Sequence, residues 1–381
     1  MPDSLPIKPR VAYLITNSEI GGAQTHVADL LCAMRGQVDA VLLAGGDGPL
    51  FELASRLGIT AIRLGTMDNA LSPFKAMMAL RELLNALRQV TPDVIHTHSA
   101  KASAIGRLAG RLLGIPVVYT VHGFAFKRAA PWKQRTAAHL TEWLLAPLTH
   151  QLICVSEAER SMAMRLPMIP DSRISVIPNG IADIDTSARA DASRPFRRIV
   201  TVMRLAQPKR ADLLIQALAA ARLENCELII AGDGPQRGAL ERLANQLAPG
   251  RVRFAGNVDD VPALLSTAQA FVLASDHEGL PISILEAMRA GLPVVASDLP
   301  GIRSQLAHGE CGILLPNDPQ SFSDALRNLA NAAAQRVRLA RAARGRWEDQ
   351  YGLEPMVRAT REIYQKVLTD GRQMSTRVSQ S

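Results

Sequence analysis

Two glutamates frame a predicted turn and helix start at residues 276–289, and their spacing suits a ligand that carries hydroxyl groups. Glu278 stands in the turn and Glu286 lies one to two turns into the helix. The residues between them that we expect to line the same site are Gly279, Leu280, Pro281 and Ile282. Backbone N–H groups at a helix start attract phosphates, while carboxylates accept hydrogen bonds from hydroxyls. The competing interpretation is a capping box, in which Glu286 accepts from the N–H of Ser283.

Two cations, Arg204 and Lys209, follow another predicted strand. A guanidinium can bind a diphosphate in a bidentate way, and an ammonium adds a point charge. Negative charge grows on a nucleoside diphosphate as its bond to a sugar breaks, so cations at this place would stabilise a leaving group. Two solvated loop cations are the plain alternative.

Glycines mark two further strand-to-helix turns. Gly21 and Gly22 precede a helical pattern, and Gly232 and Gly234 follow a strand in the second half. Glycine allows a backbone to approach a ligand closely. Val258, after the next strand, could offer backbone contacts to a base. Neither half contains G-x-G-x-x-G, which argues against a dinucleotide-dependent oxidoreductase.

The elements that must position these residues alternate between strand and helix, which is typical of doubly wound parallel sheets. We therefore predict an α/β protein with two Rossmann-like domains facing across a cleft. The predicted divisions are a domain at 1–182, a linker at 183–195, a domain at 196–350, a helix at 351–369 that returns to the first domain, and a mobile tail at 370–381. Asp183 and Asp185 in the linker are expected to be solvated acids.

Composition is that of an ordinary globular protein. The chain has 381 residues, a formal charge of +8 and four cysteines that are far apart and form no C-x-x-C pair. We expect no disulfide framework, no metal and a reducing, cytoplasmic compartment, because neither a signal peptide nor a membrane-spanning stretch is evident. The positive charge suggests anionic partners, but no basic and aromatic interleaving indicates nucleic acid.

Residues 94–141 contain no acidic residue but seven lysines and arginines. Aromatic residues lie among them, and a basic segment with interfacial aromatics fits an anionic membrane surface or a lipid diphosphate. An unremarkable pair of basic helices is an equally good interpretation. The residues that we select as acceptor or membrane contacts are Lys127, Arg128, Trp132, Lys133 and Arg135.

Three histidines lie in predicted strands of the first half or directly after one. His96 and His98 are two residues apart on a strand and so share a face. No third ligand accompanies them in the sequence, and we interpret them as structural or acceptor-lining rather than metal-binding. His122 precedes Gly123, where a lone histidine can simply cap the turn.

Taken in order, these motifs resemble the GT-B glycosyltransferases of family 4 over about residues 11–365. The motifs that carry the resemblance are Gly21-Gly22, His122-Gly123, Pro178-Asn-Gly180, Arg204 with Lys209, Gly232-Asp-Gly-Pro235 and Glu278-x7-Glu286. The stretches 96–102 and 120–126 further resemble a branch that builds capsular, exopolysaccharide or O-antigen repeat units. One departure is Arg210, where many relatives have glycine.

The resemblance implies a role for each matching residue. Glu286 would bind the ribose hydroxyls and Glu278 the donor sugar, while Arg204 and Lys209 hold the diphosphate. Gly22 would approach the diphosphate, and the resemblance favours a place for His122 beside the reacting centre.

The resemblance also implies transfer with retention at the anomeric carbon and without a bound metal or other cofactor. We predict a retaining glycosyltransferase that uses a nucleotide sugar, UDP-linked rather than GDP-linked, and a lipid-linked saccharide acceptor. It would act as a peripheral protein on the inner face of the cytoplasmic membrane. The alternatives are a UDP-sugar 2-epimerase of the same architecture and a non-catalytic sugar-binding protein.

Overall fold

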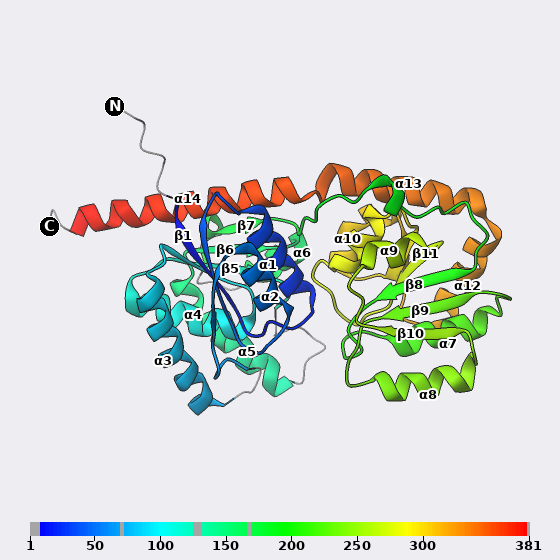
Figure 1. Cartoon of the computed structure of the whole chain (residues 1–381), viewed down its shortest axis with the longest axis horizontal. Helices are drawn as coiled ribbons and strands as arrows, with labels where there is room; N and C mark the ends of the chain where they lie inside the picture. Colours follow the sequence, from blue (N-terminus) through cyan, green and yellow to red (C-terminus); the bar gives the residue numbers. More distant parts are fainter. Residues whose placement is uncertain (1–7, 69–71, 125–131, 166–168, 379–381) are drawn as a thin grey trace. The chain divides into compact units, whose positions relative to one another are not determined.

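The computed structural model describes residues 8–68, 72–124, 132–165 and 169–378. The chain divides into two compact units, and Figure 1 shows the elements of each. The first unit contains residues 1–179 and 353–381, and the second contains residues 180–352.

The first unit is built on a seven-stranded parallel sheet in the order β3-β2-β1-β4-β5-β6-β7. Its strands are β1 (Arg10–Ile15), β2 (Asp39–Ala44), β3 (Thr60–Arg63), β4 (Val94–Thr97), β5 (Val117–Val121), β6 (Gln151–Cys154) and β7 (Ile174–Val176). Its α-helices are α1 (Gly22–Ala33), α2 (Pro49–Leu57), α3 (Pro73–Val90), α4 (Ala100–Leu113), α5 (Trp132–Leu145), α6 (Glu157–Ala163) and α14 (Leu353–Val378). The strand order reverses between β1 and β4, and open α/β sheets bind ligands at such a point.

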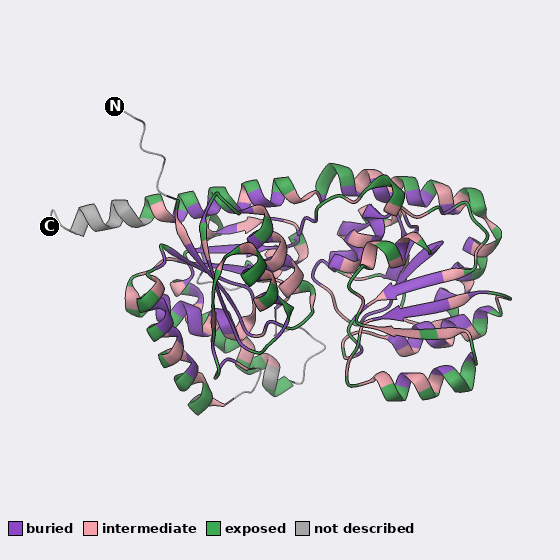
Figure 2. Ribbon diagram, viewed as in Figure 1, coloured by how far each residue is buried: buried purple, intermediate pink, exposed green. Residues whose placement is uncertain are grey.

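Strand β1 shows why helices cover both faces of this sheet. Tyr13 packs in one apolar core with Val27 of α1 and Tyr364 of α14. Its neighbour Leu14 points to the other face and packs with Leu83 of α3. Alternate residues of a strand point to opposite faces, so a strand that is buried throughout needs a partner layer on each side. Figure 2 shows the central strands buried and the outer sides of the helices exposed.

The second unit repeats this plan with a six-stranded parallel sheet in the order β10-β9-β8-β11-β12-β13. Its strands are β8 (Arg198–Val202), β9 (Glu227–Ala231), β10 (Val252–Gly256), β11 (Ala270–Leu273), β12 (Val294–Ser297) and β13 (Ile313–Leu315). Its α-helices are α7 (Ala211–Ala221), α8 (Arg237–Leu247), α9 (Val261–Ser266), α10 (Ile282–Arg289), α11 (Pro300–Gln305), α12 (Pro319–Asn331) and α13 (Ala333–Gln350). The order reverses between β8 and β11, which pair directly.

The predicted fold class, two doubly wound parallel sheets, is confirmed by these strand orders. Helix α14 is longer than predicted, because it continues to Val378 instead of ending near residue 369. Helix α10 begins at Ile282 with Pro281 as its N-cap. Ser283 therefore lies inside the first turn, and the capping box that requires it as the N-cap is not formed.

The segment predicted as a linker, 183–195, belongs to the second unit and is fastened to it by arginines. Buried Arg336 donates to the carbonyl oxygens of Ala192 and Arg194, each at 2.9 Å. Arg344 binds both carboxylate oxygens of Asp183 at 2.7 Å. These hydrogen bonds to the guanidinium hold the pKa of Asp183 down to about 2. Asp183 is thus ion-paired, where the sequence suggested a solvated acid.

Candidate active site

The loops that follow β8 and β11 meet at the point where the second sheet reverses its strand order. They bring together Lys209 and Glu278, which form an ion pair although they are far apart in sequence. Their side chains are only 19% and 12% exposed. In a charged pair with little access to water, either charge would be costly without a partner.

Backbone hydrogen bonds fasten these two loops to each other. The N–H of Arg210 donates to the carbonyl of Ala274 at 3.0 Å, and the N–H of Asp276 donates to the carbonyl of Pro208 at 2.9 Å. The Arg210 guanidinium binds Asp212, with Nη2 to Oδ2 at 2.8 Å, and reaches Asp276 at 3.3 Å. These carboxylates, Asp212 first, raise the pKa of Arg210. The residue that departs from the family pattern therefore braces the loop beside Lys209.

Helix α10 places Glu286 on its only accessible strip. Six of the eight residues of this fully described helix are buried, and the two that are partly exposed are Ser283 and Glu286. They stand three positions apart and so share one side of the helix. Glu286, selected from the sequence, is thus a partly exposed carboxylate of this helix, and its role in binding a ligand stays a prediction.

Arg204 is exposed between two buried neighbours, Met203 and Leu205. No carboxylate among the described residues pairs with its guanidinium, in contrast to Lys209 and Arg210. An arginine without a protein partner at the carboxyl end of a strand is available to bind an anionic ligand.

Two glycines predicted to approach a ligand have a structural reason to be glycine. A Cβ on Gly232 would lie 2.0 Å from the carbonyl oxygen of Met203, and one on Gly234 would lie 2.5 Å from that of Leu205. The loop after β9 thus packs directly on the loop that carries Arg204. Val258 follows β10 in a partly exposed loop. Donor binding by these three residues stays a prediction.

The turn after Glu278 is fixed by its neighbours. A Cβ on Gly301 of α11 would lie 1.7 Å from the carbonyl oxygen of Gly279, and Gln305 donates to the carbonyl of Pro281 at 3.1 Å. Leu280 and Ile282 are buried. Because both side chains are buried, any contact of Leu280 or Ile282 with a ligand would be made by the backbone, and donor binding by this turn stays a prediction.

In the first unit, the turn from β1 to α1 contains the predicted phosphate loop. A Cβ on Gly22 would meet no atom within 4 Å, so the space in front of it is open. A Cβ on Gly21 would lie 2.6 Å from the side-chain oxygen of Gln24. No described residue requires glycine at position 22, which is consistent with a ligand approaching the backbone there.

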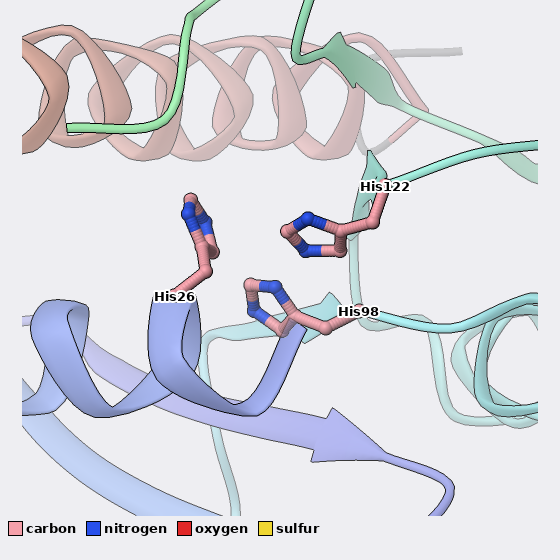
Figure 3. Close-up of side chains that lie close together, drawn as sticks. All are labelled: His26, His98 and His122. Carbon is pink, nitrogen blue, oxygen red and sulfur yellow. The ribbon is translucent and has the colours of Figure 1, made fainter. Parts of the chain in front are cut away.

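Histidines surround the place where this sheet reverses its strand order. His96 is a structural residue, because its ring nitrogens bond the Tyr364 hydroxyl at 2.6 Å and the Thr120 hydroxyl at 2.7 Å. His98 follows β4 and His122 follows β5, and their ring centroids are 5.9 Å apart. His26 of α1 completes the group (Figure 3).

Sequence reasoning missed His26, which lies among the apolar positions of α1. It also argued against a metal because His96 and His98 lacked a third ligand. The structure supplies two further histidines beside His98, whereas both nitrogens of His96 are engaged.

Burial keeps this group uncharged at neutral pH. Desolvation lowers the pKa of His26 to about 4, against a weaker raising effect of a hydrogen bond with Asn179. The pKa values of His96, His98 and His122 are also lowered well below the usual value, first by desolvation and then by neighbouring histidines. A neutral imidazole can accept a proton, accept a hydrogen bond or bind a metal.

Two of the cations in the basic segment 94–141 form ion pairs within the protein. Arg107 is buried in an ion pair with Glu142 at 2.9 Å, and Lys101 pairs with Asp68 at 3.1 Å. Two of the predicted membrane contacts, Lys127 and Arg128, lie outside the described residues. The other three, Trp132, Lys133 and Arg135, stand in the first turns of α5.

The two doubly wound sheets, which match each other in strand order, have the architecture of the GT-B class of glycosyltransferases. The chain belongs to glycosyltransferase family 4. Residues 20–183 match the family described as Glycosyltransferase Family 4, and residues 196–332 match that described as Glycosyl transferases group 1. The predicted family is thereby confirmed.

The relatives include enzymes of polysaccharide assembly. An Escherichia coli UDP-Gal:alpha-D-GlcNAc-diphosphoundecaprenol alpha-1,3-galactosyltransferase is 30% identical over 312 residues, covering 76% of this chain and 79% of the relative. The O-antigen biosynthesis glycosyltransferase WbnH of Escherichia coli is 25% identical, covering 81% and 86%. Among solved structures, Anabaena HepE in complex with UDP and glucose has a TM-score of 0.81 at 19% identity, covering 94% and 100%. The fold is thus that of GT-B enzymes.

Within the part of the chain that the structure describes, no helix combines the length and the apolar character needed to cross a bilayer.

Proposed function

We propose that this glycosyltransferase moves a sugar from a UDP-sugar to a lipid-linked saccharide during surface polysaccharide biosynthesis, with retention at the anomeric carbon. The observation that carries the proposal is the Lys209–Glu278 ion pair at the switch point of the second sheet. Arg204, free of carboxylate partners among the described residues, and Glu286, on the accessible strip of α10, supply the other groups that a nucleotide sugar requires.

Donor binding would exchange the partners of this pair. The Lys209 ammonium would move to the diphosphate and leave Glu278 to accept hydrogen bonds from the sugar hydroxyls. Arg204 would add a second cation, and Glu286 would accept from the ribose hydroxyls. In the first unit, Gly22 and His122 are the residues proposed to contact the donor.

Transfer would then follow the departure of the diphosphate. As the bond between the anomeric carbon and the phosphate oxygen breaks, the acceptor hydroxyl forms the new bond from the same face. Its proton passes to the leaving phosphate oxygen. Lys209 and Arg204 stabilise the charge that grows on that oxygen, a role in which preorganised cations contribute most. None of the described side chains at these positions is a convincing covalent nucleophile.

The names of related proteins support the choice of donor and acceptor. The Escherichia coli galactosyltransferase is named for UDP-Gal and a diphosphoundecaprenol-linked GlcNAc, and HepE was solved with UDP-glucose. We take a UDP-sugar and a polyprenyl-diphosphate-linked saccharide as the substrates to test first. Because Arg204 and Lys209 can neutralise the diphosphate, transfer should need no metal. Activity should therefore persist in excess chelator.

A thermal-shift screen of UDP- and GDP-sugars tests the donor. A ligand that binds the folded protein at a hundred times its Kd stabilises it by about 2.7 kcal/mol. We expect one UDP-sugar to raise the Tm and the Lys209→Met variant to lose this shift. Stabilisation by GDP-sugars alone, or an equal shift in Lys209→Met, would reject the proposal.

Helix α5 supports membrane association through an unusual distribution of residues. Its exposed large apolar residues, Trp132, Leu140, Trp143 and Leu144, recur at helical spacing on one side, whereas the acidic Glu142 is buried against Arg107. A helix that exposes apolar residues and buries an ion pair is suited to an apolar environment on its outer side. Helix α4 packs against α5, and helix α3 packs against α4. These two helices add exposed Phe74, Met77, Met78, Leu108 and Leu112. We propose that this side of the first unit rests on the inner face of the cytoplasmic membrane.

Sedimentation with anionic phospholipid vesicles tests this surface. The Trp143→Ser/Leu144→Ser variant should bind vesicles several-fold more weakly than the wild type, because it removes apolar side chains that would enter the lipid. Leu247→Ser, at an exposed leucine of α8 in the second unit, is the matched control and should sediment like the wild type. Equal sedimentation of all three proteins would refute the proposed surface.

A further inference from the structure

Three histidines from three separate elements turn their rings toward one point in the first unit (Figure 3). His26 lies on α1, His98 follows β4 and His122 follows β5. Ring centroids are 4.7 Å apart for His26 and His122, 5.5 Å for His26 and His98, and 5.9 Å for His98 and His122. One ring nitrogen from each residue lies within 4.8 Å of the other two.

The ring of His98 indicates that these histidines do more than fill space in the core. Its side chain is only 1% exposed, yet neither of its nitrogens makes a hydrogen bond with any described residue. The same holds for Nε2 of the half-buried His122. A buried polar atom in a folded protein has a partner as a rule, so nitrogens aimed at a common point indicate a ligand there.

The chemistry of the donors selects a transition-metal cation. Imidazole nitrogens suit Zn²⁺, Cu²⁺ and Ni²⁺, whereas Mg²⁺ and Ca²⁺ require oxygen ligands, and this group contains no carboxylate. Metal-bound nitrogens at about 2.0–2.1 Å around a tetrahedral ion stand roughly 3.4 Å apart, so small side-chain rotations would close the site. Burial also favours the neutral, metal-binding form of each ring.

We propose that His26, His98 and His122 form a binding site for one Zn²⁺ ion, with a fourth position open on the side of half-buried His122. His96 lies against His98, with ring centroids 4.1 Å apart, but its nitrogens are held by Thr120 and Tyr364. It therefore acts as a positioning residue that limits where the ring of His98 can turn, as residues behind metal ligands commonly do.

The effect of the ion on transfer rests on the proposed function. If His122 contacts the donor sugar, Zn²⁺ bound to it withdraws that contact, and the cation is an inhibitor that a chelator removes. Binding of the ion does not depend on this consequence, so binding and inhibition can be tested apart.

Binding is tested on the full chain, freed of metal, with Zn²⁺ in competition with a chromophoric chelator. Co²⁺, which takes the same ligands and absorbs visible light, reports the coordination geometry. We expect one Zn²⁺ per chain, an intense four-coordinate Co²⁺ spectrum, and no competition from Mg²⁺. His26→Gln and His98→Gln should each weaken Zn²⁺ binding at least a hundredfold.

The exposed His308 in the second unit provides the matched control, and His308→Gln should bind Zn²⁺ like the wild type. A variant at buried His98 could fail to fold, so X-ray absorption at the zinc edge is also measured on the wild-type protein. The spectrum should show three imidazole nitrogens bound to the ion. Absence of stoichiometric binding, a six-coordinate Co²⁺ spectrum, or unchanged affinity in His26→Gln would overturn the site. Zinc binding without inhibition of transfer would retain the site and reject only the role of His122 in transfer.

Discussion

The ion pair of Lys209 and Glu278 holds two charges that a nucleotide sugar would separate. Both side chains are largely shielded from water, and the pair joins loops from neighbouring strands. Glu286, on α10, is not a member of this ion pair. The two carboxylates should therefore fail in different ways when each is made neutral, although both substitutions remove one negative charge.

In Glu278→Gln, the amide no longer holds Lys209, so UDP should bind as well as or more tightly than in the wild type. Turnover should fall at least tenfold, because the sugar loses a charged hydrogen-bond acceptor. In Glu286→Gln, UDP binding should weaken about tenfold to a hundredfold, the loss expected for a hydrogen bond to a charged group.

Calorimetric titration with UDP, together with measurement of kcat, separates the two effects. Glu241→Gln, on the exposed side of α8, is the control and should change neither quantity. Weakened UDP binding in Glu278→Gln with normal binding in Glu286→Gln would reverse the assignments and contradict the proposed roles.

At the scale of elements, a buried ion pair joins helix α5 to helix α4. Arg107 of α4 is fully buried beneath it, pairs with Glu142 and lies over the ring of Tyr119 at 5.3 Å. Desolvation raises the pKa of Glu142, against the lowering effect of Arg107. A buried charge is tolerated only while its partner stays in place.

Glu142→Leu should destabilise the first unit by about 3–5 kcal/mol, because it leaves Arg107 buried without its counter-charge. The double variant Arg107→Met/Glu142→Leu should recover most of this loss. Urea unfolding of the wild type and of both variants measures the difference. If Glu142→Leu were as stable as Arg107→Met/Glu142→Leu, the ion pair would not be needed to keep α5 packed on α4.

Local sequence signals were sufficient for the elements and insufficient for their long-range contacts. The alternation of strands and helices in both halves was predicted correctly, because apolar periodicity and end signals are local. The clamp of Arg336 and Arg344 on the segment 183–195 joins residues more than a hundred positions apart. Nothing in the local pattern around either arginine indicates such a partner, and the same is true of His26.

The candidate site divides in the same way. Arg204, Lys209, Glu278 and Glu286 could be selected from the sequence, because each follows a strand or opens a helix at the ligand-binding edge of a sheet. The ion pair between Lys209 and Glu278 could not be predicted from the sequence. It forms only because β8 and β11 are neighbours in the sheet. The close packing of Gly232 and Gly234 on the loop that carries Arg204 could not be predicted either, because that loop lies elsewhere in the sequence.

For the molecule as a whole, the buried histidines predict sensitivity to acid. His26 has a folded pKa of about 4, below the usual value near 6.5, so the unfolded chain binds more protons between these values. The stabilising contribution is fully present above pH 6.5 and is lost as the pH falls toward 4. The lowered pKa values of His96, His98 and His122 act in the same direction.

The free energy of unfolding of the first unit should therefore fall with decreasing pH, by about 1.4 kcal/mol per pH unit for each histidine that is protonated only on unfolding. Urea unfolding between pH 8 and 4, read at peptides of β1 by pulsed hydrogen exchange, measures this slope. In His26→Gln, the slope of the free energy of unfolding against pH should be smaller by the contribution of one proton. A wild-type stability that does not change between pH 7 and 5 would contradict the uncharged state of the cluster.

The transfer reaction itself tests the central claim most directly. The full chain is incubated with a radiolabelled UDP-sugar and a polyprenyl-diphosphate-linked saccharide, and label is followed into the lipid fraction. The account predicts that label enters with the wild type, in the presence of chelator, with the α-configuration of the donor preserved, and that Glu286→Gln reduces the rate at least tenfold. No labelled lipid with any UDP-sugar, or conversion of the UDP-sugar to an epimer without an acceptor, would contradict it.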